Sequence, residues 1–110
     1  MDAGKKMDEL TAERVLKWKN KDGQWRDEEA ERDTSLQPFS AVLNAAWLVV
    51  DKICEEGYRL QLEGSRIWQA RFYKSVAHTL ETRAYDATAG EPALAICRAA
   101  LAVRGVETKK

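Results

Sequence analysis

Two arginines and two tyrosines recur at alternate positions in the second half of the chain. Residues two apart in an extended strand point to the same side of it. A guanidinium group can bind a phosphate through paired hydrogen bonds, and an aromatic ring can stack on a base. We therefore predict that these four side chains share the outward face of a sheet and bind a small phosphorylated ligand. They are Arg71, Tyr73, Arg83 and Tyr85.

Trp25 and Arg26 complete the predicted ligand site. They lie in a polar, acidic stretch, residues 24–37, which has few apolar residues beyond the tryptophan and predicts a short strand followed by a long irregular connection. Such a connection can close over a neighbouring sheet face. The alternative is that Tyr73 and Trp25 pack beneath a helix while the arginines pair with nearby glutamates.

Catalytic chemistry has little support in the sequence. Cys54 and Cys97 lie among apolar neighbours in helical patterns, which favours two buried thiols in a reducing compartment, with a disulfide or a reactive thiol as alternatives. His78 is the only histidine, which argues against a histidine-based metal site. The acidic run at 26–33 is interleaved with arginines, as in a solvated loop. We find no phosphate-binding glycine loop, nucleophile elbow or zinc-ligand spacing, and we expect no enzyme, cofactor, metal or catalytic residue.

Composition limits the range of partners. The chain has 110 residues, which suits one domain, and 18 Lys and Arg residues balance 18 Asp and Glu residues. This balance gives no bulk charge to hold nucleic acid or an anionic membrane, so we expect neither as a partner. No apolar run approaches the roughly 18 residues of a membrane span, and the start lacks a signal sequence, which predicts a cytoplasmic protein. We expect a flexible leader at 1–6, one domain at 7–105 and a flexible tail at 106–110.

Helical periodicity occurs in three segments: residues 7–18, 38–57 and 91–104. In the second segment we expect Ser40 to be the N-cap and Gly57 to adopt the left-handed conformation that ends a helix. The third contains "EPALAICRAAL", in which alanines separate larger apolar residues. Its spacing predicts a packing face rather than a binding site.

The hydrophobic period changes to two after the second helical segment. It predicts strands at 58–63, 66–74 and 76–87, with Ala84 on the inward face of the last one. The order of elements indicates an α+β fold, a three-layer α-β-α sandwich with an antiparallel sheet of three or four strands and about three helices. We consider the first helix, 7–18, the candidate cover for the second face of the sheet.

Four blocks in this order resemble the phage ABA sandwich domain family: "ELTAERVLKW", "WRDEEAER", "PFSAVLNAAWLVVDKICEEGY" and "EPALAICRAAL". The resemblance extends over residues 7–104. One difference is Pro92-Ala93-Leu94, where the family pattern has Pro-Leu directly. The resemblance implies a phage or prophage origin and an α-β-α sandwich, and it implies no catalytic set.

Some small phage proteins of comparable size bind a host immune nucleotide and withhold it from its effector. By this analogy we expect a non-enzymatic anti-defence protein, a sponge for a small nucleotide ligand in the cytoplasm of the infected bacterial host. We also expect a homo-oligomer, because protomers can enclose a small ligand between them. The alternative is a structural or interaction protein that self-assembles or binds a host protein without a small ligand.

Overall fold

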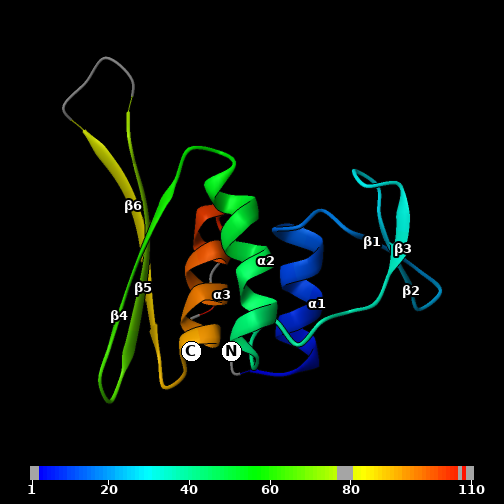
Figure 1. Ribbon diagram of the computed structural model, residues 1–110, viewed down its shortest axis with the longest axis horizontal. Coiled ribbons are helices and arrows are strands. Elements are labelled where there is room, and N and C mark those ends of the chain that lie inside the picture. The colour runs from blue at the N-terminus through cyan, green and yellow to red at the C-terminus, as the bar shows by residue number, and fades with distance from the viewer. Residues whose placement is uncertain (1–2, 77–80, 107, 109–110) are drawn as a thin grey trace.

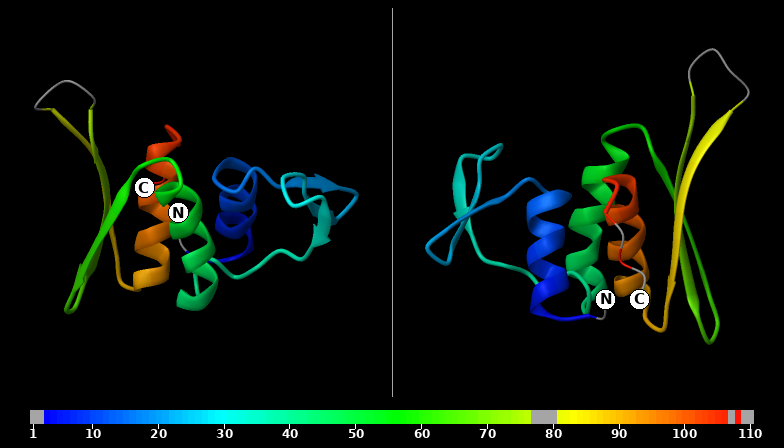
Figure 2. Two further views of the ribbon diagram at one scale, coloured as in Figure 1. Left: turned by 45° about the horizontal axis from the view of Figure 1, so that its top comes forward. Right: turned by 180° about the vertical axis from the view of Figure 1, so that it is seen from behind.

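The computed structural model describes residues 3–76, 81–106 and 108. These residues form an α+β fold with three helices and two antiparallel three-stranded sheets. The helices form a layer between the two sheets (Figures 1 and 2). The predicted fold class, an α+β sandwich with an antiparallel sheet and three helices, is confirmed.

The helices are α1 (Lys5–Arg14), α2 (Leu43–Cys54) and α3 (Pro92–Val103). The small sheet contains β1 (Lys19–Lys21), β2 (Gln24–Asp27) and β3 (Arg32–Thr34). The main sheet contains β4 (Arg59–Gly64), β5 (Trp68–Ser75) and β6 (Thr82–Ala89). Among the described residues, we find no helix with the length and apolar character that crossing a bilayer requires.

Helix α3 is the centre of the core. It packs on β5 and β6 of the main sheet and also contacts α2 and α1. Eight of its residues are buried, on nearly all sides of the helix: Ala93, Leu94, Ala95, Ile96, Cys97, Ala99, Ala100 and Leu101. The small alanine side chains allow the sheet and the other helices to approach closely. The predicted packing role of this segment is confirmed.

Helix α2 begins later than its sequence predicts. Val42 occupies the N-cap position, without a capping side-chain hydrogen bond. Ser40 is buried and instead hydrogen-bonds to Asp8 of α1, so our assignment of this serine as the N-cap is wrong. The prediction for the other end is confirmed, because Gly57 has a left-handed φ of 96° just after the helix.

Helix α1 lies on the side of the helical layer away from the main sheet (Figure 1). It contacts α3 and β1, and the hydrogen bonds between Asp8 and Ser40 hold it beside the start of α2. The first helix therefore does not cover the second face of the main sheet, which corrects our expectation for it. That face carries no described helix (Figure 2).

The register of the main sheet fixes which side chains face the helices. Phe72 is fully buried, and it pairs with Leu60 on β4 and with Tyr85 on β6. Directly paired residues share a face, so Tyr85 lies on the inner face. Ala84 pairs with Tyr73 on the outer face and is exposed. Our prediction for this strand, with Ala84 inward and Tyr85 outward, is wrong by one residue.

The short strand that we expected around Trp25 is present as β2, and β3 lies within the connection that we expected to be irregular. Asp22 and Gly23 both have positive φ, 52° and 85°, and form the two-residue turn of a hairpin, as their sequence suggests. The second hairpin, which adds β3, is not predicted by the sequence. Its strands are polar and lack alternating apolar residues, and Trp25 supplies the buried apolar side chain.

Candidate anion-binding site

The six predicted ligand residues lie in three separate places. Arg71 and Tyr73 are on the outer face of β5, while Arg83 and Tyr85 are on the inner face of β6. Trp25 and Arg26 are in β2 of the small sheet, beyond the helices (Figure 1). The prediction that they form one surface is wrong, because the register of β6 turns its arginine and tyrosine toward the helical side. Whether any of them binds a ligand stays a prediction.

In two of these places a carboxylate lies near the arginine. Arg26 lies 3.3 Å from Asp33 and 3.9 Å from Glu28, measured between nitrogen and carboxylate oxygen. On the outer face of the main sheet, Arg71 pairs directly with Asp86 across the strands. Each arginine therefore has a carboxylate beside it.

The inner face places two cations opposite each other. Lys74 of β5 pairs directly with Arg83 of β6, so their Cβ atoms are roughly 5 Å apart. Like charges in such a position destabilise the strand pair. Neither cation makes an ion pair with a carboxylate of a described residue. An anion bound between them would remove this repulsion.

Two tyrosine rings form the apolar wall beside these cations. The Lys74 ammonium lies 4.5 Å from the ring centroid of Tyr58, in a cation–π contact. The ring of Tyr58 meets that of Tyr85 edge to face, with centroids 6.2 Å apart. Burial raises the pKa of Tyr58, so its hydroxyl stays protonated and can donate a hydrogen bond at neutral pH. Neither hydroxyl is hydrogen-bonded to a described residue.

Of these four side chains only Arg83 is exposed; Lys74 and Tyr85 are half-buried, and Tyr58 is 8% exposed. The ends of β5 and β6 next to Lys74 and Arg83 reach past the helices (Figure 1). Glu56, which precedes the turn into β4, is held by Arg104 through a hydrogen bond of 2.6 Å between Nη1 and Oε1. That pairing engages the glutamate, which makes no ion pair with Lys74 or Arg83. We name Tyr58, Lys74, Arg83 and Tyr85 the hairpin cluster.

Sequence reasoning found half of the hairpin cluster. It identified Arg83 and Tyr85 but missed Tyr58, which immediately precedes β4, and Lys74, which is in β5. The signal that could have found them is cross-strand pairing, which places Lys74 opposite Arg83 and next to Tyr58. These pairs can be identified only when the strand register is known, and the predicted register of β6 was off by one residue.

The thiols are not arranged for catalysis. Cys97 is fully buried, and this burial raises its pKa to about 12, so the thiol is protonated at neutral pH. Cys54 is half-buried, and burial together with the nearby Asp51 carboxylate raises its pKa. His78 lies outside the described residues. Within those residues, we find no group of three or more His, Cys, Asp or Glu side chains that could hold a metal ion.

Comparison with known proteins gives two findings. The family model of the phage ABA sandwich domain matches residues 9–101. A crystal structure of a phage protein from Bacillus cereus ATCC 14579 superposes with a TM-score of 0.73 at 20% sequence identity, over 99% of this chain and 95% of that one. At this level of sequence identity, the superposition shows that the two chains share a fold. No curated protein matches the sequence.

Proposed function

We propose that this chain, which belongs to the phage ABA sandwich domain family, is a non-enzymatic phage protein that binds a small phosphorylated ligand. The observation that carries the proposal is the direct pairing of Lys74 with Arg83 without a carboxylate partner among the described residues. A phosphate between them would accept hydrogen bonds from both side chains and offset their repulsion. The hairpin cluster is the proposed site.

The chemistry of the cluster favours a nucleotide. The ammonium and guanidinium groups suit a phosphate, and the half-buried ring of Tyr85 suits contact with a sugar or base. We propose that the protein sequesters a nucleotide signal of host defence in the cytoplasm of the infected bacterium. In this proposal the protein is a homo-oligomer, because a ligand on an exposed sheet end becomes well enclosed only when a second protomer covers it.

A thermal-shift screen tests this function. The panel contains cyclic dinucleotides, cyclic trinucleotides and ADP-ribose derivatives, each added to the full chain. A ligand at 100 times its dissociation constant adds about 2.7 kcal/mol of stability, which corresponds to roughly 10 °C in Tm for a domain of this size. We expect such a shift with at least one phosphorylated compound. If every compound leaves Tm unchanged, the nucleotide proposal is wrong.

A second function is favoured by the exposed side of α2. Its first turns and N-cap carry apolar side chains that are 37–46% exposed: Val42, Leu43, Trp47 and Leu48. Exposed apolar residues clustered on one surface are a mark of protein contacts. The alternative proposal is an interaction protein that self-assembles, or binds a host protein, through this surface.

Light scattering after size-exclusion chromatography separates the two functions. If α2 mediates self-assembly, the wild type is oligomeric and Trp47→Glu is monomeric, with no effect of nucleotides. If the hairpin cluster mediates ligand binding, Trp47→Glu retains the thermal shift of the wild type. A nucleotide-induced shift that survives this substitution supports the first function and counts against the second.

A further inference from the structure

Strand β6 forms one edge of the main sheet, and its backbone is regular. It pairs with β5 alone among the described strands, through eight consecutive residue pairs without a bulge. It contains neither proline nor lysine, two residues that commonly protect an edge from further pairing. Backbone groups along such an edge can bond to another strand. The edge of β6 is therefore a candidate interaction surface.

Alternate residues of β6 direct their backbone groups away from the sheet. Val76 N donates a hydrogen bond to Glu81 O at 2.9 Å, so this residue pair is a hydrogen-bonded one. The alternation of an antiparallel ladder then turns the N–H and C=O groups of four residues of β6 away from β5. They are Thr82, Ala84, Asp86 and Thr88. Arg98 of α3 donates from Nη1 to Thr88 O at 2.8 Å, so the last of these positions is already occupied.

The three remaining positions suit a second copy of the same strand. Because they are centred on Ala84, a two-fold axis at this residue pairs Thr82 of each copy with Asp86 of the other, and Ala84 with itself. This register places no like charges opposite each other. A shift in one direction brings in Thr88, whose carbonyl Arg98 binds. A shift in the other direction moves Asp86 past the end of the second strand.

The same register joins the two hairpin clusters. On the inner face, Arg83 of each copy lies opposite Tyr85 of the other, a favourable position for a guanidinium group beside a ring. The two Arg83 residues become diagonal neighbours, with Cα atoms roughly 7–8 Å apart. Lys74 continues each row, because it pairs with Arg83 within its own sheet. Two lysines and two arginines thus surround one two-fold axis.

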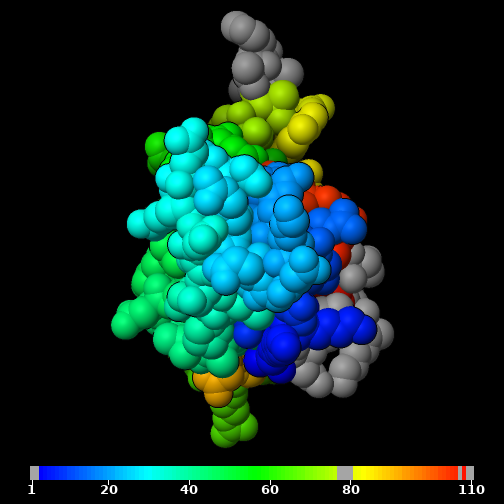
Figure 3. Space-filling view, turned by 90° about the vertical axis from the view of Figure 1, so that its right-hand side faces the viewer, coloured from blue at the N-terminus to red at the C-terminus, as the bar shows by residue number. Residues whose placement is uncertain are grey.

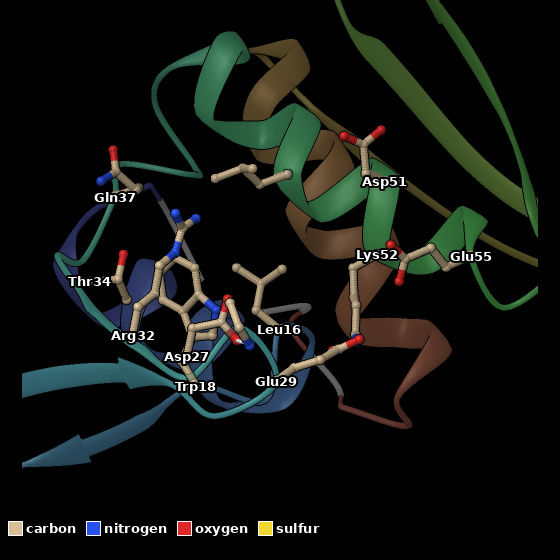
Figure 4. Close-up of a pocket in the computed structure, with 12 residues that line it drawn as sticks. Leu16, Trp18, Asp27, Glu29, Arg32, Thr34, Gln37, Asp51, Lys52 and Glu55 are labelled. Atoms are coloured by element: carbon tan, nitrogen blue, oxygen red, sulfur yellow. Dashed lines mark hydrogen bonds and ion pairs between the residues drawn. The ribbon is translucent and has the colours of Figure 1, made fainter.

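The cavity between α2 and the small sheet offers no comparable place for an anion. Its volume is about 520 Å³, and it lies on the side of the molecule that Figure 3 shows. Figure 4 shows Glu29 beside Lys52, at 2.6 Å, and Asp27 pairs with Arg32 across the strands. Its lining contains four carboxylates and two cations, so a phosphate would be repelled.

We propose that β6 pairs with β6 of a second copy, and that the joined hairpin clusters bind one two-fold symmetric ligand with two phosphates. Cyclic dinucleotides have this chemistry. Each phosphate would accept hydrogen bonds from the lysine and arginine of one copy. The ligand part of this inference rests on the proposed function, whereas the strand pairing rests on the backbone of β6 alone.

Disulfide cross-linking tests the strand pairing. In a Cys54→Ser background, Ala84→Cys places two thiols opposite each other, at a Cα separation of about 5.5 Å that a disulfide can span. We expect mild oxidation to give a covalent dimer of this variant. Thr88→Cys, on the same face of the strand but outside the pairing, should stay monomeric under denaturing conditions. Absence of the Ala84→Cys dimer, or equal cross-linking of Thr88→Cys, would refute the pairing.

Light scattering with a lysine at the edge gives a second test. Ala84→Lys places two ammonium groups opposite each other at the axis, so we expect a monomer, whereas wild type, Thr88→Lys and Trp47→Glu should be dimers. Ala84 is exposed, so the variant should fold, which the Tm checks. A wild type that is monomeric both alone and with cyclic dinucleotides would overturn the inference.

Isothermal titration calorimetry with cyclic di-AMP and cyclic di-GMP tests the joined site. We expect one ligand for two chains with at least one of these compounds, and an affinity at least tenfold lower in Ala84→Lys. One ligand for each chain, or an unchanged affinity in Ala84→Lys, would contradict the joined site. If Ala84→Cys cross-links but no phosphorylated compound binds, the proposed function and the joined site are wrong and the strand pairing stands.

Discussion

Asp8 is a buried carboxylate whose hydrogen bonds connect two helical segments. Asp8 is only 6% exposed. Its Oδ1 accepts hydrogen bonds from Ser40 N at 2.8 Å and from Ser40 Oγ at 2.7 Å. Ser40 Oγ in turn accepts a hydrogen bond from Gly4 N at 3.0 Å. The network places the start of α1 against the segment that leads into α2. A buried charge of this kind is tolerated because its hydrogen-bonding capacity is used.

Replacing this carboxylate should destabilise the fold. Asp8→Ala leaves the buried Ser40 N–H without its acceptor, and we expect the free energy of unfolding to fall by roughly 2–3 kcal/mol. Asp8→Asn keeps an acceptor oxygen at the same position and should cost less. Urea denaturation measures both, with Glu13→Ala on the exposed side of α1 as the control. A loss for Asp8→Ala no larger than that of the control would contradict this role.

The role of Ser40 illustrates what the sequence does not contain. A serine shortly before a helical pattern is a good N-cap candidate, because its oxygen can accept a hydrogen bond from a nearby backbone N–H. In the fold it binds Asp8, which is 32 residues away, and α2 starts at Leu43. A long-range partner overrides the local preference, and one sequence cannot reveal that partner.

Cys97 should be unreactive in the folded protein. It is fully buried and burial raises its pKa to about 12, so a thiolate forms only when α3 is opened. In a Cys54→Ser variant, we expect Ellman's reagent to label Cys97 slowly under native conditions and rapidly in denaturant. Labelling of this variant at the same rate in both conditions would show that the thiol is accessible.

At the scale of elements, Arg104 connects the ends of all three helices. Its guanidinium donates hydrogen bonds to both carboxylate oxygens of Glu56 after α2, and to the backbone carbonyls of Arg14 and Val15 at the end of α1. The side chain is only 15% exposed. Because Arg104 follows α3, one side chain fixes the relative position of the three helix ends and of the turn into β4.

This link predicts a pH dependence of stability. The hydrogen bond from Arg104 lowers the pKa of Glu56, so the glutamate stabilises the fold at neutral pH and this contribution is lost as the pH falls through its folded pKa. We expect Glu56→Gln to lower the free energy of unfolding by about 1 kcal/mol at pH 7, a modest value because the glutamate is partly exposed.

Urea unfolding at pH 7 and pH 3 measures the effect. At pH 3 the stabilities of wild type and Glu56→Gln should approach each other, because this pH lies below the usual pKa of a glutamate and the contribution declines from there toward the lowered folded pKa. Glu13→Gln provides the control for a carboxylate on the surface. A difference between wild type and Glu56→Gln that is as large at pH 3 as at pH 7 would rule out this explanation.

The elements differ in how well their sequence predicts them. In α3 the 3.6-residue period and Pro92 at the start determine both type and location, and the prediction is confirmed. In β6 the type is correct but the phase is not, because alanine occurs on both faces, at 84 on one and at 87 and 89 on the other. Small residues give no contrast from which to infer the buried side. In the small sheet only β2 is predicted, as the short strand around Trp25, and β1 and β3 are missed because they are polar.

At the scale of the whole molecule, the main sheet separates the predicted site into two chemical environments. Arg71 lies on the outer face opposite a carboxylate, Asp86, whereas Arg83 lies on the inner face opposite another cation, Lys74. The sequence identified both arginines as candidates, but only the register distinguishes them. The two are therefore a matched pair, since each is an exposed arginine on the same sheet.

This matched pair allows the most direct test of the ligand site. Calorimetry with the phosphorylated compound that gives the largest thermal shift should be repeated on Arg83→Gln and Arg71→Gln. We predict that Arg83→Gln lowers the affinity at least tenfold without loss of stability, because it also removes the repulsion from Lys74, and that Arg71→Gln binds like the wild type. Unchanged affinity in Arg83→Gln, or an equal loss in Arg71→Gln, would contradict the assignment of the hairpin cluster as the binding site.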